Sequence, residues 1–256
     1  MKNKKLFVLL PIIALTACNS LGNEITQEEA SKKALAISEK QTVTNTFSFS
    51  YTITTNDKTS KEVRKYKYVQ DDLGSFMISR DESEGEYKSS KTVYDVLTSR
   101  SSKVLYIKTY DGSKDKTTIQ AYVWTLKGTG DYDNALNKQE AFIKEMTDYY
   151  ESVVYAISQS PNVGDSYNES YKYYSTGEGN LTAKLAFTYN GQENESAIKK
   201  IDRTYEYNNN LLTSYNGTYV TFNGKKRTEV AKASYSNITV ELPSDWEEHV
   251  MTSVSM

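Results

Sequence analysis

Apolar and polar residues alternate along two long parts of this sequence, and the alternation predicts two runs of β-strands. The clearest stretch is 46–54, where Phe47, Phe49, Tyr51 and Ile53 alternate with serine and threonine. A period of two places these four side chains on one face of a strand. Similar patterns predict the other strands at 61–70, 75–80, 86–99, 103–111, 117–126, 166–175, 181–190, 196–207, 211–222 and 226–241.

Short polar connections separate these segments, which favours antiparallel pairing because parallel neighbours need long crossovers. They include an acidic turn at 81–85 and Asn-Gly dipeptides at 190–191 and 223–224, which are strong hairpin signals. In the last segment the apolar positions change from odd to even numbers near 236–237. We expect a β-bulge there, which keeps both sets of apolar side chains on one face.

Two other segments show the helical period of about 3.6 residues. Thr26 and Glu29 form a capping box, which predicts a helix that runs to about Lys40. A second helix is predicted over 134–158, before Pro161. It carries a single apolar stripe, which we expect to lie against the sheet. The stripe consists of Leu136, Ile143, Met146, Tyr150, Val153 and Ile157.

The first eighteen residues have the three-part layout of a secretory signal peptide. Three lysines precede the apolar run 6–15, and residues 15–18 (LTAC) resemble the bacterial lipobox, in which the cysteine is lipidated. Ten apolar residues are half of the roughly 20 that a membrane-spanning helix needs. The alternative is an ordinary signal peptide, which is cleaved without lipidation. Cys18 is the only cysteine of the chain, so it has no partner for a disulfide within the chain. We therefore favour lipidation of Cys18.

The composition limits which functions and which domain organisation are expected. Removal of residues 1–17, which contain three lysines and no acid, leaves 28 basic and 33 acidic residues. This balance gives no reason to expect nucleic acid, and it leaves membrane attachment to acyl chains on Cys18. No linker rich in proline or serine divides the chain. We therefore expect a signal peptide (1–17), a lipidated tether (18–25), one β domain (26–246) and a polar tail (247–256).

The order of elements is one helix, six strands, one long helix and five strands. It predicts a mainly β fold, an antiparallel curled sheet or unclosed half-barrel of about eleven strands, with the long helix over its concave face. With the lipobox, this order resembles the lipoprotein-carrier superfamily of LolA, LolB, LppX and LprG. The resemblance implies helices over the concave side of a half-barrel and a cavity that takes acyl chains.

Catalytic chemistry has little support in the sequence. The single histidine, His249, lies near the C-terminus, and no Gly-x-Ser-x-Gly elbow or phosphate-binding loop is present. With one cysteine and one histidine, no Cys/His metal site can be built. We expect a protein that is not an enzyme and has no metal and no cofactor.

Two functions fit this layout. The first is a membrane-anchored, extracytoplasmic lipoprotein of a Gram-positive cell surface that binds lipid or another hydrophobic ligand in its half-barrel. The second is a structural or interaction lipoprotein with a filled core, for adhesion or envelope sensing; the sequence names no protein partner. Because a lined cavity and a packed core have the same pattern, both stay open. The candidate lining residues are Phe47, Phe49, Tyr51, Ile53, Ile143, Met146, Tyr150 and Val153.

Overall fold

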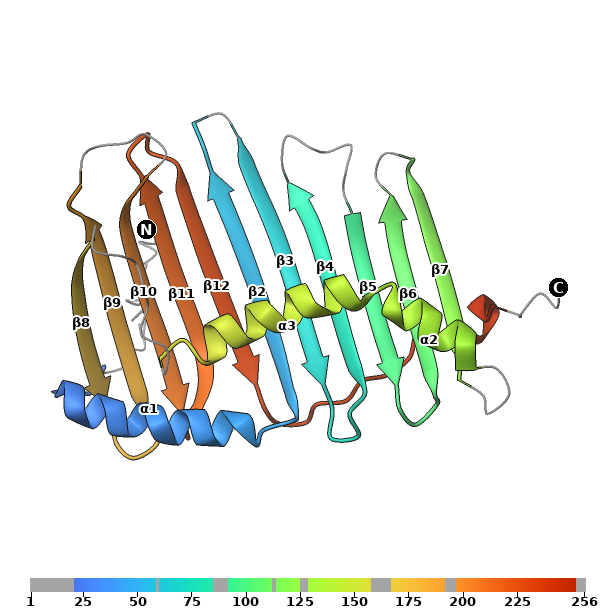
Figure 1. Ribbon diagram of the computed structural model, residues 1–256, viewed down its shortest axis with the longest axis horizontal. Coiled ribbons are helices and arrows are strands. Elements are labelled where there is room, and N and C mark those ends of the chain that lie inside the picture. Colours follow the sequence, from blue (N-terminus) through green and yellow to red (C-terminus); the bar gives the residue numbers. More distant parts are fainter. Residues whose placement is uncertain are drawn as a thin grey trace, which may run out of the picture.

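The computed structural model describes residues 21–58, 60–84, 92–111, 114–124, 129–157, 167–191 and 197–251. These residues form one antiparallel sheet of twelve strands, with three α-helices on one of its faces (Figure 1). The elements in chain order are β1 (Asn23–Ile25), α1 (Gln27–Thr42), β2 (Phe47–Asn56), β3 (Lys61–Gln70), β4 (Phe76–Glu84), β5 (Thr92–Ser99), β6 (Val104–Asp111), β7 (Lys116–Val123), α2 (Thr129–Asn137), α3 (Glu140–Val154), β8 (Tyr167–Ser175), β9 (Leu181–Tyr189), β10 (Ile198–Asn208), β11 (Leu211–Thr221), β12 (Lys226–Ser234) and the 3₁₀ turn η2 (Trp246–His249).

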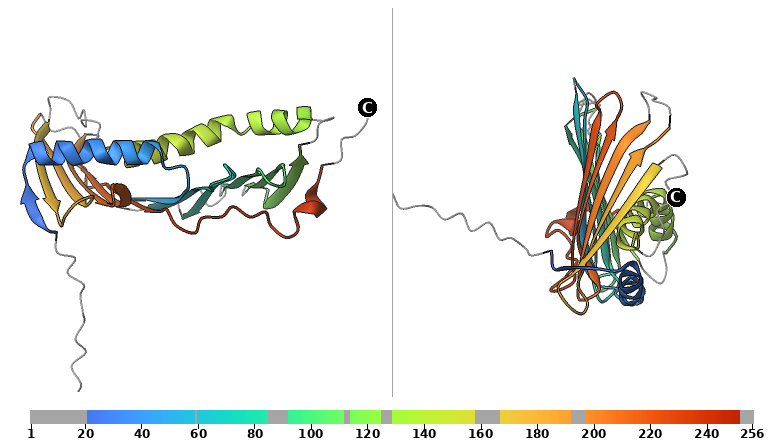
Figure 2. Two further views of the ribbon diagram at one scale, coloured as in Figure 1. Left: turned by 90° about the horizontal axis from the view of Figure 1, so that it is seen from below. Right: turned by 90° about the vertical axis from the view of Figure 1, so that its left-hand side faces the viewer.

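The two runs of strands join side by side. The order in the sheet is β1-β8-β9-β10-β11-β12-β2-β3-β4-β5-β6-β7, so that the last strand of the chain pairs with β2. The edge strands β1 and β7 do not pair with each other, and the sheet curls without closing (Figure 2). The predicted mainly β, unclosed antiparallel fold is confirmed, with twelve strands where about eleven were expected.

The additional strand is β1, in a segment that we expected to be tether. Asn23 pairs with Ser175 of β8, and the two following residues continue the ladder. Gly22 makes this approach possible: its φ is +81°, and a Cβ atom there would lie 2.3 Å from the Ser175 carbonyl oxygen. Only glycine fits such a position.

Strand β4 is longer than predicted, because the acidic residues expected to form a turn at 81–85 continue the strand as far as Glu84. In the backbone register Asp81 lies opposite Lys65 of β3. Opposite charges on neighbouring strands stabilise such a pairing. The part of the next predicted strand from 86 to 91 lies outside the described residues.

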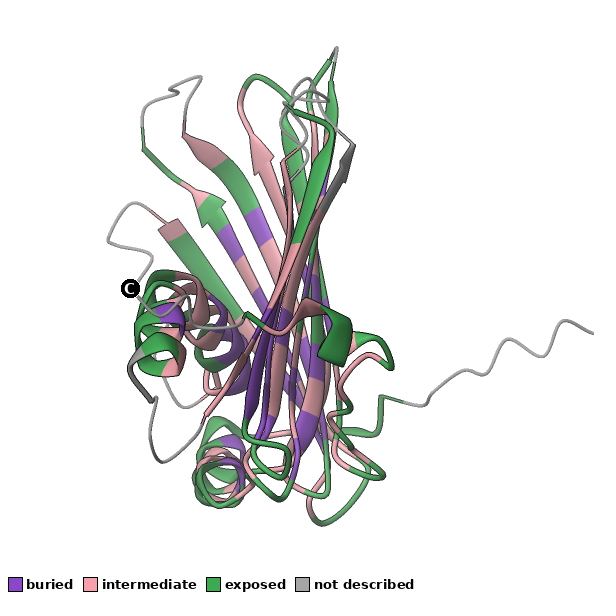
Figure 3. Cartoon of the chain, turned by 90° about the vertical axis from the view of Figure 1, so that its right-hand side faces the viewer, coloured by how far each residue is buried: buried purple, intermediate pink, exposed green. Residues whose placement is uncertain are grey.

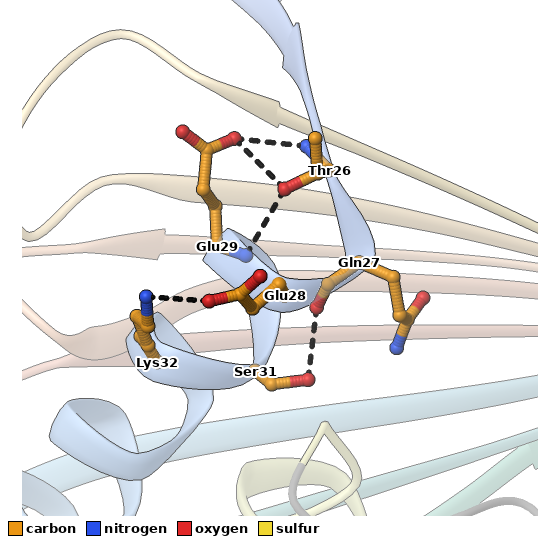
Figure 4. A network of polar contacts seen from close by, with 6 residues as sticks. All are labelled: Thr26, Gln27, Glu28, Glu29, Ser31 and Lys32. Carbon is orange, nitrogen blue, oxygen red and sulfur yellow. Dashed lines mark hydrogen bonds and ion pairs between the residues drawn. The ribbon is translucent and has the colours of Figure 1, made fainter.

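The predicted capping box begins α1 (Figure 4). The Glu29 amide donates to Thr26 Oγ1 at 3.2 Å, and the Thr26 amide donates to Glu29 Oε2 at 2.9 Å. The reciprocal bonds satisfy two amides that the first helical turn leaves free, and they lower the pKa of the Glu29 carboxyl. The helix buries Ala30 and Ile37 and ends at Thr42, slightly beyond the predicted end.

The predicted long helix over 134–158 is wrong as a single helix. It is two helices, α2 and α3, which begin earlier and end earlier than predicted. Between them the Gln139 amide donates to the Leu136 carbonyl, a tighter turn than that of an α-helix. The break lets α2 and α3 pack on different parts of a curved sheet: Ala135 is buried against β5 and β6, and Met146 is buried in the main core.

The main core lies between the sheet and the helices α1 and α3. Figure 3 shows the buried residues gathered on the surfaces that face each other, whereas the outer turns of the helices are exposed. This core contains the inward-facing residues of β2 and of the strands β8 to β12, including Phe49, Phe187 and Leu212, which have no exposed surface. Burial of this kind is the chief source of stability.

The C-terminal segment corrects a second prediction. Strand β12 ends at Ser234, and residues 235–251 cross to the other face of the sheet (Figure 2). Ala231 is buried in the main core, whereas Val240 and Leu242 pack on the opposite face against β5 to β7, so no bulge brings them to one face. Both sets are apolar because each covers a different face. In the predicted tail 247–256, the Met251 amide donates to the Ala121 carbonyl of β7 at 2.8 Å.

Candidate functional site

The eight residues that we predicted to line a cavity lie together in a packed core. Seven of them are buried, and Ile143 is partly buried against the same cluster. The Phe47 and Tyr150 rings stack at 4.3 Å between centroids, with Phe49 set edge-on to Tyr150 at 5.3 Å. The rings fill the space between β2 and α3. Ligand binding by these residues stays a prediction, and none of them lines the three cavities described next.

The cavity with the most suitable walls for a ligand lies at the other end of the concave face, between α2 and the ends of β4 to β6. Its volume is about 400 Å³, within the roughly 300–1,000 Å³ of small-molecule sites. Four half-buried apolar or aromatic side chains form its walls: Phe76, Trp124, Tyr132 and Leu136. The polar lining consists of Thr98, Ser99, Arg100, Lys103 and Asp133.

Local structure holds these walls in place. The Asp71 carboxylate accepts bonds from the Leu73 and Ser75 amides, which fixes the turn before Phe76. The Trp124 amide donates to the Lys103 carbonyl at 2.8 Å, which ties the end of β7 to the β5–β6 turn. Burial is the largest influence on Tyr132 and raises the pKa of its hydroxyl. The walls are therefore built on strand ends and one helix.

Two other cavities have less suitable linings. A larger one, of about 730 Å³, lies between α1 and the β8–β9 turn, but Ile25 is the only large apolar residue of its lining, which otherwise includes Glu29, Lys32 and Lys33. A smaller one, of about 180 Å³, lies under the C-terminal segment on the opposite face of the sheet. Because ligand sites combine apolar walls with a few polar groups, the cavity under α2 is the best candidate.

A buried polar cluster lies on the concave face between β10 and β2. The hydroxyls of Tyr215 and Tyr219 donate to Glu229 Oε2 at 2.8 Å and 3.0 Å, and Arg227 pairs with Glu229 Oε1 at 2.6 Å. A Cβ atom on Gly217 would lie 2.3 Å from the Tyr215 hydroxyl, so a side chain at this position would displace the tyrosine ring. The carboxylate is thus fully partnered, and we interpret this cluster as structural.

Catalytic and metal-binding arrangements do not emerge from the described residues. His249 Nε2 lies 3.5 Å from Oδ2 of Asp245, the residue that precedes the 3₁₀ turn η2. In the described ranges no three side chains of the His, Cys, Asp and Glu types are grouped to hold a metal ion. Within the same ranges no helix has the length and apolar character needed to cross a membrane. Cys18, the predicted lipidation site, lies outside the described residues.

Sequence reasoning missed most of the cavity. Leu136 belongs to the predicted apolar stripe, but Trp124 lies near the end of the predicted strand 117–126 and Tyr132 precedes the predicted helix 134–158. Their aromatic character was the available signal. The turn residues Arg100 and Lys103 gave none, since charged residues are ordinary in turns.

Comparison with known proteins finds similarity of three-dimensional structure. No family model and no curated protein matches the sequence. The chain is similar to the crystal structure of LprF from Mycobacterium bovis, with 10% identity over 86% of this chain and 99% of that chain and a TM-score of 0.38. For a LolA superfamily protein from Nitrosomonas europaea the identity is 11%, the shares are 86% and 96%, and the TM-score is 0.24.

A DUF1329 family protein from Desulfovibrio piger is also similar, with 12% identity over 87% of this chain and 97% of that chain and a TM-score of 0.25. These three likenesses extend over most of each chain, at low sequence identity.

Proposed function

We propose that this protein is a membrane-anchored, extracytoplasmic lipoprotein that binds the apolar chain of a lipid or similar amphiphile in the cavity under α2. The observation that carries this proposal is the cavity itself, with Phe76, Trp124, Tyr132 and Leu136 only half-buried around about 400 Å³. A ligand chain would cover these side chains and complete their burial. The proposed role is binding and transfer, without catalysis.

The driving force is the removal of apolar surface from water. Each methylene group that enters an apolar site contributes about 0.8 kcal/mol, and immobilisation of the ligand offsets part of this gain. Since a bilayer offers a chain a similar environment, uptake from a membrane is close to balanced and therefore reversible. Anchoring through Cys18 places the cavity near the bilayer and raises the local ligand concentration.

Ligand binding is tested on the mature chain, residues 18–256, with Cys18→Ser so that it carries no acyl chain of its own. We expect a fluorescent fatty acid to bind and co-purified lipid to appear in native mass spectra. Leu136→Trp places a larger ring in the cavity and should weaken binding. The control is Leu35→Trp, at a position on α1 that is 66% exposed. A protein that takes up no fatty acid and carries no lipid contradicts the proposal.

Anchoring is tested separately in cells. In the full chain, Cys18→Ser should move the protein from the membrane fraction to the soluble fraction or block its processing, because lipidation requires the thiol. The matched control is Ser20→Ala, which leaves the cysteine intact. A Cys18→Ser protein that stays in the membrane after processing contradicts the lipid anchor.

A second function has support from the other end of the molecule. The stacked rings of Phe47, Phe49 and Tyr150 fill the space beneath α3. A filled core suits a structural or interaction lipoprotein whose working surface lies outside. The fatty-acid experiment separates the two functions, because a structural lipoprotein leaves the cavity under α2 filled with water.

A further inference from the structure

Two cations lie at the cavity under α2. Arg100 and Lys103, in the turn between β5 and β6, line it together with the apolar walls, and both are exposed. One acidic residue, Asp133 of α2, lines the same cavity. The formal charge of the lining is therefore +1, beside aromatic and aliphatic surfaces.

The backbone and the aromatic wall hold both cations at this place. The Arg100 backbone amide donates to Ser75 Oγ at 3.0 Å, and the Arg100 side chain donates from Nε to the Gly74 carbonyl at 3.4 Å. Lys103 has a φ of +53°, and its Nζ lies 4.8 Å from the centre of the Trp124 ring. A cation over a tryptophan face is attracted to it. These contacts keep the positive charge beside the apolar wall.

Neither cation has an acidic partner. Elsewhere on the sheet, arginines pair with carboxylates, as Arg227 does with Glu229 at 2.6 Å and Arg80 with Glu145 at 3.7 Å. In the described part of the chain, no carboxylate lies within ion-pair distance of Arg100 or Lys103. The donors of the Arg100 guanidinium, apart from Nε, are thus available to an anion.

We infer that the ligand of this cavity is an anionic amphiphile, whose carboxylate or phosphate head binds Arg100 and Lys103 while its chain lies against Trp124, Tyr132 and Leu136. This inference rests on the proposed function and adds the charge of the head group. Arginine and lysine both donate charge-assisted hydrogen bonds to carboxylates and phosphates. A turn that carries lysine and arginine for solubility alone would not need its charges beside a half-buried apolar cavity.

The experiment compares ligands that share a ten-carbon chain and differ in the head: decanoate, decyl phosphate and decanol. Binding to the mature chain with Cys18→Ser is measured by calorimetry. We expect both anions to bind at least tenfold more tightly than decanol. In Arg100→Gln/Lys103→Gln this preference should fall to twofold or less. The ratio of decanoate to decyl phosphate affinity identifies which head the site prefers.

Two variants control for charge and folding. Lys138→Gln removes an exposed cation that does not line the cavity, and it should leave the preference intact. Asp133→Asn should strengthen the binding of both anions about twofold. If all three ligands bind with equal affinity to the unsubstituted protein, the inference fails and the proposed function stands. If none binds, the proposed function fails. Retention of the preference in the double variant overturns the role of the two cations.

Discussion

The two ends of the concave face differ in what lies beneath the helix. Under α3, large rings from both layers meet, as Phe47 and Tyr150 do at 4.3 Å. Under α2, the small residue Ala135 is buried over Val96, Leu105 and Ile107. A small residue in the contact leaves the neighbouring large side chains half-covered. Side-chain size under each helix therefore decides whether this fold forms a core or a cavity.

The first prediction compares stability at the two ends. Phe49→Ala, in the packed part, should lower the free energy of unfolding by about 3–5 kcal/mol, because it leaves a hole in a rigid core. Leu136→Ala, in the wall of the cavity, should cost about 1–2 kcal/mol, because its side chain is already partly exposed to water. Urea unfolding followed by circular dichroism measures both changes. Equal losses would contradict the distinction between a core and a cavity.

The second prediction concerns alkaline pH and the tyrosines of the packed part. Burial is the main cause that raises the pKa of Tyr66 and of Tyr205 from 10.0 to about 12. Above pH 10 the unfolded chain loses these protons while the folded chain keeps them, so the free energy of unfolding falls as the pH rises towards 12. Each tyrosine contributes a slope of up to about 1.4 kcal/mol per pH unit.

The check is the unfolding free energy of the unsubstituted protein and of Tyr205→Phe across this pH range. Phenylalanine keeps the ring in the core and removes one titrating hydroxyl, so the fall of stability with pH should be less steep. An identical slope in both proteins would show that Tyr205 is not protected from deprotonation in the folded state.

Much of the fold could be predicted because local signals agree with the tertiary structure. The alternation of Phe47, Phe49, Tyr51 and Ile53 identifies the inner face of β2, and Thr26 with Glu29 identifies the start of α1. The break between α2 and α3 could not be predicted, since no glycine or proline marks it. It follows the curvature of the sheet, which arises from contacts between distant residues.

The two apolar sets of the last segment show a second limit. Ala231 and Val240 are both apolar, but periodicity does not reveal that the chain crosses from one face of the sheet to the other between them. The same limit applies to the cavity, because Phe76, Arg100, Trp124 and Tyr132 come from four separate segments. Sequence patterns describe faces of single elements, and a site between elements depends on how those elements meet.

The most direct test uses the two tryptophans of the chain, Trp124 in the cavity wall and Trp246 on the opposite face of the sheet. In the mature chain with Trp246→Phe, a bromine-labelled dodecanoic acid should quench the fluorescence of Trp124 in a saturable manner. In Trp124→Phe, the remaining Trp246 should keep its fluorescence. Quenching of Trp246 to the same extent, or no quenching of Trp124, would contradict a ligand chain in the cavity under α2.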